Sequence, residues 1–442
     1  MIDSPTALPD KPVKAACRGS SVALPRSVTR GWIVGLGFAA WLGTLWLVRW
    51  LKLNDAVLGT VICIGSLAAV NFVLDAVFSK VQLSQSAGLD WRAPDYSWQR
   101  TGIKFLGMVA SFGFIGLLYW LFPEYQFTFH GSLPWLFVDH TGDFYGYYVH
   151  FLRWFVPCWL VVSVPYIYFV DARQKDPQDG YYAAGMAVTF QFEKVGWRVL
   201  WQHCLGWLVK GYFLALMFTY YARDTRNFIN YYFGAIRDFR SFYDFSYYFI
   251  FLADTAVACV GYLLTLRIFD THIRRTEPTF LGWAVALVCY QPFWSWISGS
   301  YLDYSKDFAW GSWLEHYPVV YAIWGSAILG LLGVYLWATI MFGCRFSNLT
   351  HRGILTNGPY RWTKHPAYIA KNLSYWLTYI PFIVSQSVAD SVRRCLLLGL
   401  LNYVYYLRAK TEEANLSTDP VYVQYANWMR ENGIFRWVRR RE

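Results

Sequence analysis

Long runs of apolar residues, separated by short polar segments, fill most of the chain. A run of about 20 apolar residues is long enough to cross a lipid bilayer as a helix. The pattern therefore predicts an all-α, polytopic integral membrane protein with about ten transmembrane helices. The expected spans are residues 31–51, 56–79, 102–122, 147–171, 196–221, 245–268, 279–299, 318–342, 367–387 and 391–409.

Two of these runs contain residues that disturb a helix or carry charge. Gln291 and Pro292 predict a kink in the seventh run, because proline lacks the backbone N–H that a helix interior uses. Lys371, Asn372 and Pro381 interrupt the ninth run. The pattern is therefore compatible with about nine or ten spans.

Basic residues gather in alternate loops between the runs, and short cytoplasmic loops typically carry such an excess of Lys and Arg. Residues 222–244 break the alternation, because they bring arginines to the predicted outer side. The distribution predicts that both termini are cytoplasmic and that residues 1–30 form a cytoplasmic N-terminal tail. The basic residues predicted to share one side are Lys80, Arg92, Arg100, Arg173, Lys175, Arg274, Arg275, Arg345, Arg352, Arg361, Lys364, Arg436 and Arg439–Arg441.

The composition narrows the class of protein. Hydrophobic residues make up 56%, aromatic residues 21% and charged residues 15%, and the formal net charge is +11. A soluble globular protein carries about 25% charged residues. These values exclude a disordered chain and a coiled coil, and no nucleic-acid partner is expected because the basic excess is spread among apolar runs. A membrane-embedded enzyme, a transporter or a scaffold remains.

Potential metal ligands do not fall in a recognisable pattern. The eight cysteines include no CxxC pair. Several His and Asp residues gather near one predicted outer loop, but their spacing matches no standard site. No metal is therefore expected. The residues of this loop region are His130, Asp139, His140, Asp143 and His150.

Polar and ionisable residues concentrate in residues 342–437, at the ends of the last two runs. In a membrane protein such residues are candidates for a functional site. Pro366 suits the first position of a helix and so places His365 at a helix N-terminus, where free N–H groups favour a carboxylate or phosphate. Arg408 and Glu412 are four residues apart and share one helical face.

A linked set of motifs in this segment resembles the isoprenylcysteine carboxyl methyltransferase family. The wider group includes phospholipid N-methyltransferases, and membrane sterol reductases have a similar C-terminal signature. The motifs are Phe346-Ser347-Asn348, Gly358-Pro359-Tyr360-Arg361, His365-Pro366-x-Tyr368 and, after one span, Glu412-Glu413 with Tyr422 and Tyr425. The resemblance implies a methyltransferase-like domain over residues 318–442 and leaves 31–317 as a multi-span region of unknown role.

The resemblance implies S-adenosylmethionine as the cofactor. Tyr422 and Tyr425 would belong to a short helix that closes the site. The residues implied to take part in catalysis are His365, Glu413 and Arg361. The implied cofactor-binding residues are Gly358, Tyr360, His365, Tyr368, Arg408, Glu412, Glu413 and Tyr422.

Two positions depart from the family pattern. Lys364 stands where the family usually has arginine, and lysine lacks the planar fork that makes bidentate contacts. Ala370 stands where the family often has glycine, so a backbone approach there is narrower. Both departures concern the detailed geometry of cofactor binding.

The expected substrate is a membrane lipid, a lipidated molecule or an isoprenoid-like compound, methylated at the cytoplasmic membrane surface. Lys371, Asn372 and Tyr375 lie early in the ninth run and are the expected substrate contacts. A carboxylate acceptor needs no base, whereas an amine or thiol must lose a proton to a base such as His365 or Glu413. The acceptor stays open, and the N-terminal spans could also dock a partner protein.

Two other functions compete with methyl transfer. A reductase of the sterol-reductase type would need cations for the 2′-phosphate of NADPH, and the paired glutamates would repel those phosphates. A non-enzymatic transporter or scaffold would explain the large region without a motif. The cations available to a reductase are Arg345, Arg352, Arg361, Arg408 and Lys410.

Overall fold

The computed structural model describes residues 23–122, 125, 144–298, 309–384 and 386–436. Over these residues the chain is an all-α protein with a single two-stranded sheet. Six of the described helices are long and apolar enough to cross a membrane, as expected of a membrane protein. They are α1 (Gly31–Trp50), α2 (Ala56–Leu74, extended by a π-helical turn to Ser79), α3 (Trp98–Leu121), α5 (Gly146–Asp171), α8 (Phe239–Leu263) and α12 (Pro318–Ile340).

The remaining helices differ from the predicted spans in length or continuity. The seventh predicted span divides into two short helices, and Pro292 lies between them. The ninth ends early, because Ile380 adopts a left-handed conformation with φ 33° and Pro381 follows it. The other helices are α6 (Gly180–Val188), α7 (Trp197–Asn230), α9 (Phe280–Leu287), α10 (Phe293–Ser298), α11 (Trp310–Leu314), α13 (Pro366–Tyr379), α14 (Val388–Leu416) and α15 (Pro420–Asn432).

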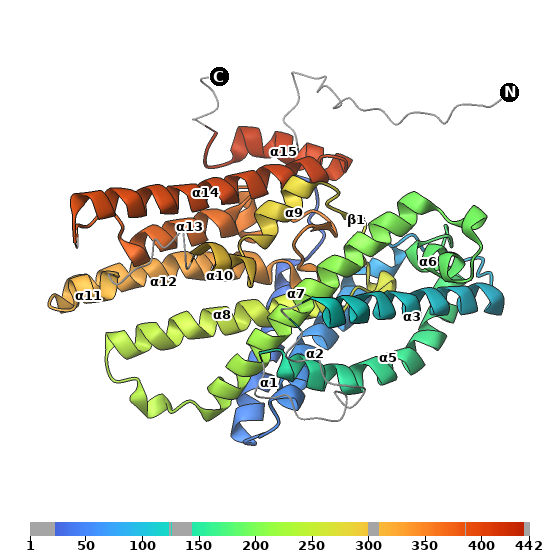
Figure 1. Ribbon diagram of the computed structural model, residues 1–442, viewed down its shortest axis with the longest axis horizontal. Coiled ribbons are helices and arrows are strands. Elements are labelled where there is room, and N and C mark those ends of the chain that lie inside the picture. The colour runs from blue at the N-terminus through green and yellow to red at the C-terminus, as the bar shows by residue number, and fades with distance from the viewer. Residues whose placement is uncertain (1–22, 123–124, 126–143, 299–308, 385, 437–442) are drawn as a thin grey trace.

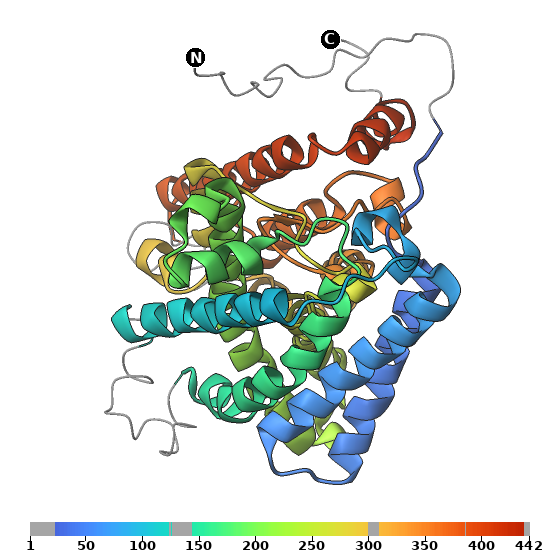
Figure 2. The same ribbon diagram turned by 90° about the vertical axis from the view of Figure 1, so that its right-hand side faces the viewer.

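The helices form two packed groups that share α8. Helices α8, α12, α13 and α14 lie side by side (Figure 1), and α15 follows the C-terminal end of α14 (Figure 2). Helices α1 and α2 pair with each other and extend away from α15 (Figure 2). The main apolar core lies between α1, α2, α5, α7 and α8. The group that contains α12, α13 and α14 therefore packs on the long helices mainly through the contact of α12 with α8.

Small residues allow α3 and α6 to pack closely. A Cβ atom added at Gly107 would lie 1.9 Å from the carbonyl oxygen of Tyr181, and one at Gly185 would lie 2.0 Å from that of Ile103. Membrane helices commonly use such small residues where their backbones approach.

A buried arginine joins the end of α8 to the segment after α12. The Arg352 guanidinium donates hydrogen bonds to the carbonyl oxygens of Gly261 at 2.6 Å, of Cys344 at 3.1 Å and of Thr271. The last carbonyls of a helix have no partner within the helix, and Arg352 satisfies that of Gly261. Arg345 lies beside it and pairs with Asp75 at 3.5 Å.

The short sheet and the N-terminal segment tie distant parts of the chain to the C-terminal region. Strand β1 (Arg275–Thr276) pairs antiparallel with β2 (Thr350–His351). Residues 23–30, predicted as part of a tail, pack against the segment before α13, where Val28 N–H donates to the Ile354 carbonyl at 2.9 Å. These contacts place β1 and the N-terminal segment beside the motif-bearing loop.

Candidate functional site

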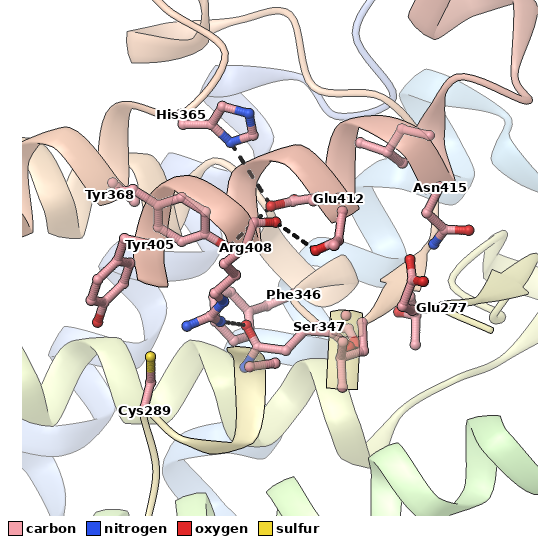
Figure 3. A pocket seen from close by; sticks show the side chains of 18 of the residues that line it. Glu277, Cys289, Phe346, Ser347, His365, Tyr368, Tyr405, Arg408, Glu412 and Asn415 are labelled. Carbon is pink, nitrogen blue, oxygen red and sulfur yellow. Dashed lines mark hydrogen bonds and ion pairs between the residues drawn. The ribbon is translucent and has the colours of Figure 1, made fainter. Parts of the chain in front are cut away.

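The motif residues meet at a cavity enclosed by α9, α12, α13, α14 and the loop that follows α12 (Figure 3). Its empty space amounts to about 1070 Å³ when the open space at its mouth is included. Its lining combines charged, amide-bearing and aromatic side chains, a mixture typical of small-molecule sites. The predicted site residues that line it are Tyr360, His365, Tyr368, Lys371, Arg408 and Glu412.

His365 stands at the start of α13, as the sequence predicts. Pro366 occupies the first helical position, and its missing N–H costs nothing there. The imidazole Nε2 lies 3.1 Å from Oε1 of Glu413, and Nδ1 lies 3.8 Å from Oε2 of Glu412. The Tyr368 ring is parallel to the imidazole, one helical turn further along α13. The histidine is thus held between the two glutamates of α14.

The two adjacent glutamates have different surroundings. Glu412 lines the cavity, and its Oε2 accepts a hydrogen bond from the Tyr368 hydroxyl at 3.0 Å. Glu413 points to the basic side of the loop, where its Oε1 lies 2.5 Å from Lys364 Nζ. Burial opposes ionisation of Glu413, but the hydrogen bonds from His365 and Lys364 outweigh it and lower its pKa to about 2. Glu412 is therefore the carboxylate available to a ligand, and Glu413 fixes His365.

The ion pairs of Glu413 predict a pH-dependent stability. Its pKa is lowered from the ordinary value of 4.5 to about 2, a difference equivalent to up to about 3 kcal/mol at neutral pH. Because the pKa falls on folding, this stabilisation is present above pH 4.5 and is lost as the pH falls toward 2. We expect the thermal unfolding midpoint of the detergent-solubilised protein to fall more steeply between pH 5 and pH 3 in the wild type than in Glu413→Gln. An equal slope in both proteins, with Glu431→Gln as the exposed control, would contradict this assignment.

Arg408 forms the inner wall of the cavity. Its guanidinium donates to Asn348 Oδ1 at 2.5 Å and lies over the rings of Tyr368 and Tyr290, 5.1 Å and 5.6 Å from their centroids. Asn348 is fixed in turn, because its amide donates to the hydroxyls of Tyr262 at 2.8 Å and Tyr290 at 3.0 Å. Within the described part of the chain, no ion pair joins the buried Arg408 to a carboxylate.

Lys371 is a second cation on the inner wall of the cavity. Its Nζ lies 5.3 Å from the centroid of the Tyr335 ring, and the Tyr335 hydroxyl donates to Asp254 at 2.7 Å. Thr339 donates to the other oxygen of Asp254 at 2.8 Å, so this carboxylate is occupied by α12. Lys371 thus lies against an aromatic ring and faces the cavity.

The other predicted site residues lie beside the cavity rather than on its wall. Asn372 donates to the Tyr368 carbonyl at 2.8 Å, and Tyr375 packs against the α14 face that contains Leu398. Arg361 is exposed in the turn before α13. These three side chains are therefore one layer removed from a ligand in the cavity.

Gly358 and Tyr422 shape the cover of the cavity. Gly358 has φ 55°, and a Cβ atom there would lie 2.8 Å from Met341 Cγ, so only glycine fits. Tyr422 lies on the buried face of α15, and the Tyr425 hydroxyl on the same helix donates to the Tyr360 carbonyl at 2.6 Å. Helix α15 thus fixes the turn at residues 358–361 over the site.

Several lining residues were missed by the sequence analysis. Asn415 lies three residues after Glu412 and seven after Arg408 on the cavity face of α14, so helical periodicity could have identified it. Tyr290 and Glu277 come from the region without a motif, where no local signal marks them. Their approach depends on the pairing of β1 with β2.

No family model, no curated protein and no solved structure matches this chain. A function for the chain therefore has to be inferred from the residues of the site. Among the described residues, no group of three or more His, Cys, Asp or Glu side chains is arranged to hold a metal ion. Of the loop residues named above, His130, Asp139, His140 and Asp143 lie outside the described residues.

Proposed function

We propose that this chain is a multi-pass integral membrane methyltransferase that uses S-adenosylmethionine and acts on a lipid or isoprenoid-like substrate. One observation carries the proposal. His365, Tyr368 and Glu412, which belong to the linked motifs, line one cavity together with Arg408. We place this site at the cytoplasmic membrane surface, with both termini on that side. The hydrogen bond from Gln424 to the Ala23 carbonyl at 3.0 Å supports a shared side for the N-terminal segment and α15.

The chemistry of the lining fits S-adenosylmethionine. The Glu412 carboxylate is suited to the ammonium of the methionine part, because charge-assisted hydrogen bonds of this kind are strong. When bound, the cofactor would supply a methyl group on a positively charged sulfur. The protein's contribution is then mainly to position the acceptor and to exclude water.

The inner wall favours an acidic acceptor. Arg408 and Lys371 both face the cavity, and Lys371 is attracted by the buried Asp254 carboxylate. Arg408 forms no ion pair with a carboxylate among the described residues. A buried cation without a counter-ion is costly, and the carboxylate of a substrate would supply one. An ammonium headgroup would instead be repelled. We therefore favour a lipid carboxylic acid over a phospholipid amine.

The same choice defines the part played by His365 and Glu413. A carboxylate is already a nucleophile, so its methylation needs no general base. The low pKa of Glu413 also makes it a weak base. We propose that Glu413 positions His365, and that His365 forms the part of the cavity wall beside Glu412.

An NADPH-dependent reductase is less well supported. Arg345 pairs with Asp75, and the N–H groups of Arg352 donate hydrogen bonds to backbone carbonyls, so neither side chain is available to a 2′-phosphate. Arg408 lines the cavity, but Glu412 lies one helical turn away. No observation in the described structure specifically favours a transporter or a scaffold.

Transfer of a labelled methyl group tests this proposal. We expect the purified protein in lipid nanodiscs to transfer label from S-adenosylmethionine to isoprenoid or fatty carboxylic acids and not to phosphatidylethanolamine. A methyl ester releases its label as methanol in mild alkali, whereas an N-methyl group does not. Alkali-stable label on the amine lipid would contradict the acidic acceptor, and absence of label from every lipid would contradict the methyltransferase.

A further inference from the structure

A second polar region of the cavity lies outside the motif-bearing wall. Glu277, which directly follows β1, and Asn415, near the end of α14, lie together on the side of the cavity opposite Tyr405 (Figure 3). Glu412 lies between this region and Arg408 along α14. The cavity thus has an acidic and amide-bearing end as well as a basic and aromatic one.

The Glu277 carboxylate is buried and held in one orientation. Its residue is only 4% exposed. The Glu277 N–H donates to the Leu349 carbonyl at 2.8 Å, and the Trp283 indole donates to the Glu277 carbonyl at 2.8 Å. Oε1 accepts from the Thr279 N–H at 3.0 Å and from its hydroxyl at 2.5 Å.

This arrangement leaves Oε2 of Glu277 for a ligand. Within the described residues, Oε2 receives no hydrogen bond and the carboxylate has no cationic partner. Isolating a buried carboxylate in this way is costly unless hydrogen-bond donors enter the cavity. Oε2 is therefore a hydrogen-bond acceptor that is held in place before a ligand binds.

Asn415 provides an unsatisfied amide beside it. The residue is 7% exposed, and its buried Oδ1 has no hydrogen-bond partner in the described part of the chain. Asn415 lies on the same face of α14 as Arg408, seven residues away. A helix rises about 1.5 Å per residue, so about 10 Å along the helix axis separates the two. That spacing suits the two ends of an elongated ligand.

We infer that Glu277 and Asn415 bind the adenosine part of S-adenosylmethionine, with the ribose hydroxyls on Glu277 and the adenine edge on the Asn415 amide. The inference rests on the proposed function. Acidic side chains accept hydrogen bonds from ribose hydroxyls in nucleotide sites. The Asn415 amide nitrogen points toward Glu277 (Figure 3), so it can donate to a ring nitrogen at the edge of adenine.

The inference orders the ligands along the cavity. The nucleoside occupies the end with Glu277 and Asn415, the methionine part lies at Glu412, and the acidic acceptor lies at Arg408 and Lys371. The carboxylate of Glu277 would also repel a phosphate on the ribose, so it selects against NADPH. A region of the chain without any motif would thereby contribute to cofactor specificity.

Calorimetric titration of the detergent-solubilised full chain tests this arrangement. The probes are S-adenosylhomocysteine and 5′-methylthioadenosine, which keeps the nucleoside but lacks the amino-acid end. We expect Glu277→Gln and Asn415→Ala each to weaken both probes about tenfold or more. Glu412→Gln should weaken S-adenosylhomocysteine and leave methylthioadenosine unchanged.

The controls separate binding from folding. Asn402→Ala changes an amide on the same helix that donates to the Leu398 carbonyl at 2.6 Å and does not line the cavity, so it should bind both probes like the wild type. Asn415→Ala removes no hydrogen bond from Oδ1, so its unfolding midpoint should stay near that of the wild type. This variant tests the inference even if Glu277→Gln folds poorly.

The outcomes distinguish this inference from the proposed function. If the wild type binds S-adenosylhomocysteine, and folded Glu277→Gln and Asn415→Ala bind both probes within about twofold of it, the inference is wrong and the methyltransferase stands. If the wild type binds neither probe, both the inference and the proposed function are overturned.

Discussion

Arg408→Gln is expected to lower the rate of methyl transfer to an acidic lipid by about 100-fold, the equivalent of about 3 kcal/mol. Arg408 is 7% exposed and is fixed by Asn348, so its charge is oriented toward the cavity before any ligand enters. Removing it would leave the acceptor carboxylate without its main cation in a site of low polarity. The loss should be measured as kcat/KM for the lipid acid.

Two further variants make this result specific to the site. Arg393→Gln changes an exposed arginine on the same helix and should keep the activity of the wild type. Arg408→Lys keeps the charge but loses the planar fork, so we expect an intermediate rate. Equal activities in Arg408→Gln and Arg393→Gln, with both proteins folded, would contradict a role for Arg408 in the site.

Glu412→Gln is expected to weaken the binding of S-adenosylhomocysteine about 10- to 100-fold, because a hydrogen bond to a charged group contributes about 1.5–3 kcal/mol. The Tyr368 hydroxyl donates to Glu412 and orients it toward the cavity. The glutamine keeps an acceptor for Tyr368 but carries no charge for the ammonium of the ligand. Calorimetry on the purified variant measures the effect.

Glu413→Gln is the matched control, because it changes the adjacent glutamate that pairs with Lys364 and His365 and does not line the cavity. It should weaken the same ligand much less than Glu412→Gln. The opposite order of effects would show that the two carboxylates have exchanged the roles assigned to them.

Hydrophobic patterning predicted the all-α class and most long helices, because a spanning helix is encoded in one continuous run of residues. The patterning predicted the helix ends wrongly where a proline or a left-handed residue interrupts an apolar run. Pro292 separates α9 from α10, and Ile380 with Pro381 ends α13 after 14 residues. A window that averages hydropathy does not register these breaks.

Part of the cavity could likewise be predicted from sequence. Local spacing relates His365 to Tyr368 and Arg408 to Glu412, and the family resemblance implied that the two pairs share one site. Periodicity did not tell Glu412 from Glu413, because their difference depends on Lys364 and His365 across the gap between α13 and α14.

The contribution of the N-terminal region could not be predicted. Glu277 and Tyr290 reach the cavity through the pairing of β1 with β2 and the packing of α9 on α14. These contacts join segments far apart in the chain, and no local sequence pattern predicts them. The same holds for Asn348, whose role depends on Tyr262 and Tyr290.

The most direct test of the central claim is calorimetric titration of the wild-type protein in detergent with S-adenosylmethionine, S-adenosylhomocysteine and NADPH. The cavity between Glu277 and Arg408 predicts micromolar binding of the first two and no measurable binding of NADPH. Binding of NADPH alone would contradict the methyltransferase and favour a reductase. Absence of binding for all three ligands would contradict a nucleotide cofactor at this site.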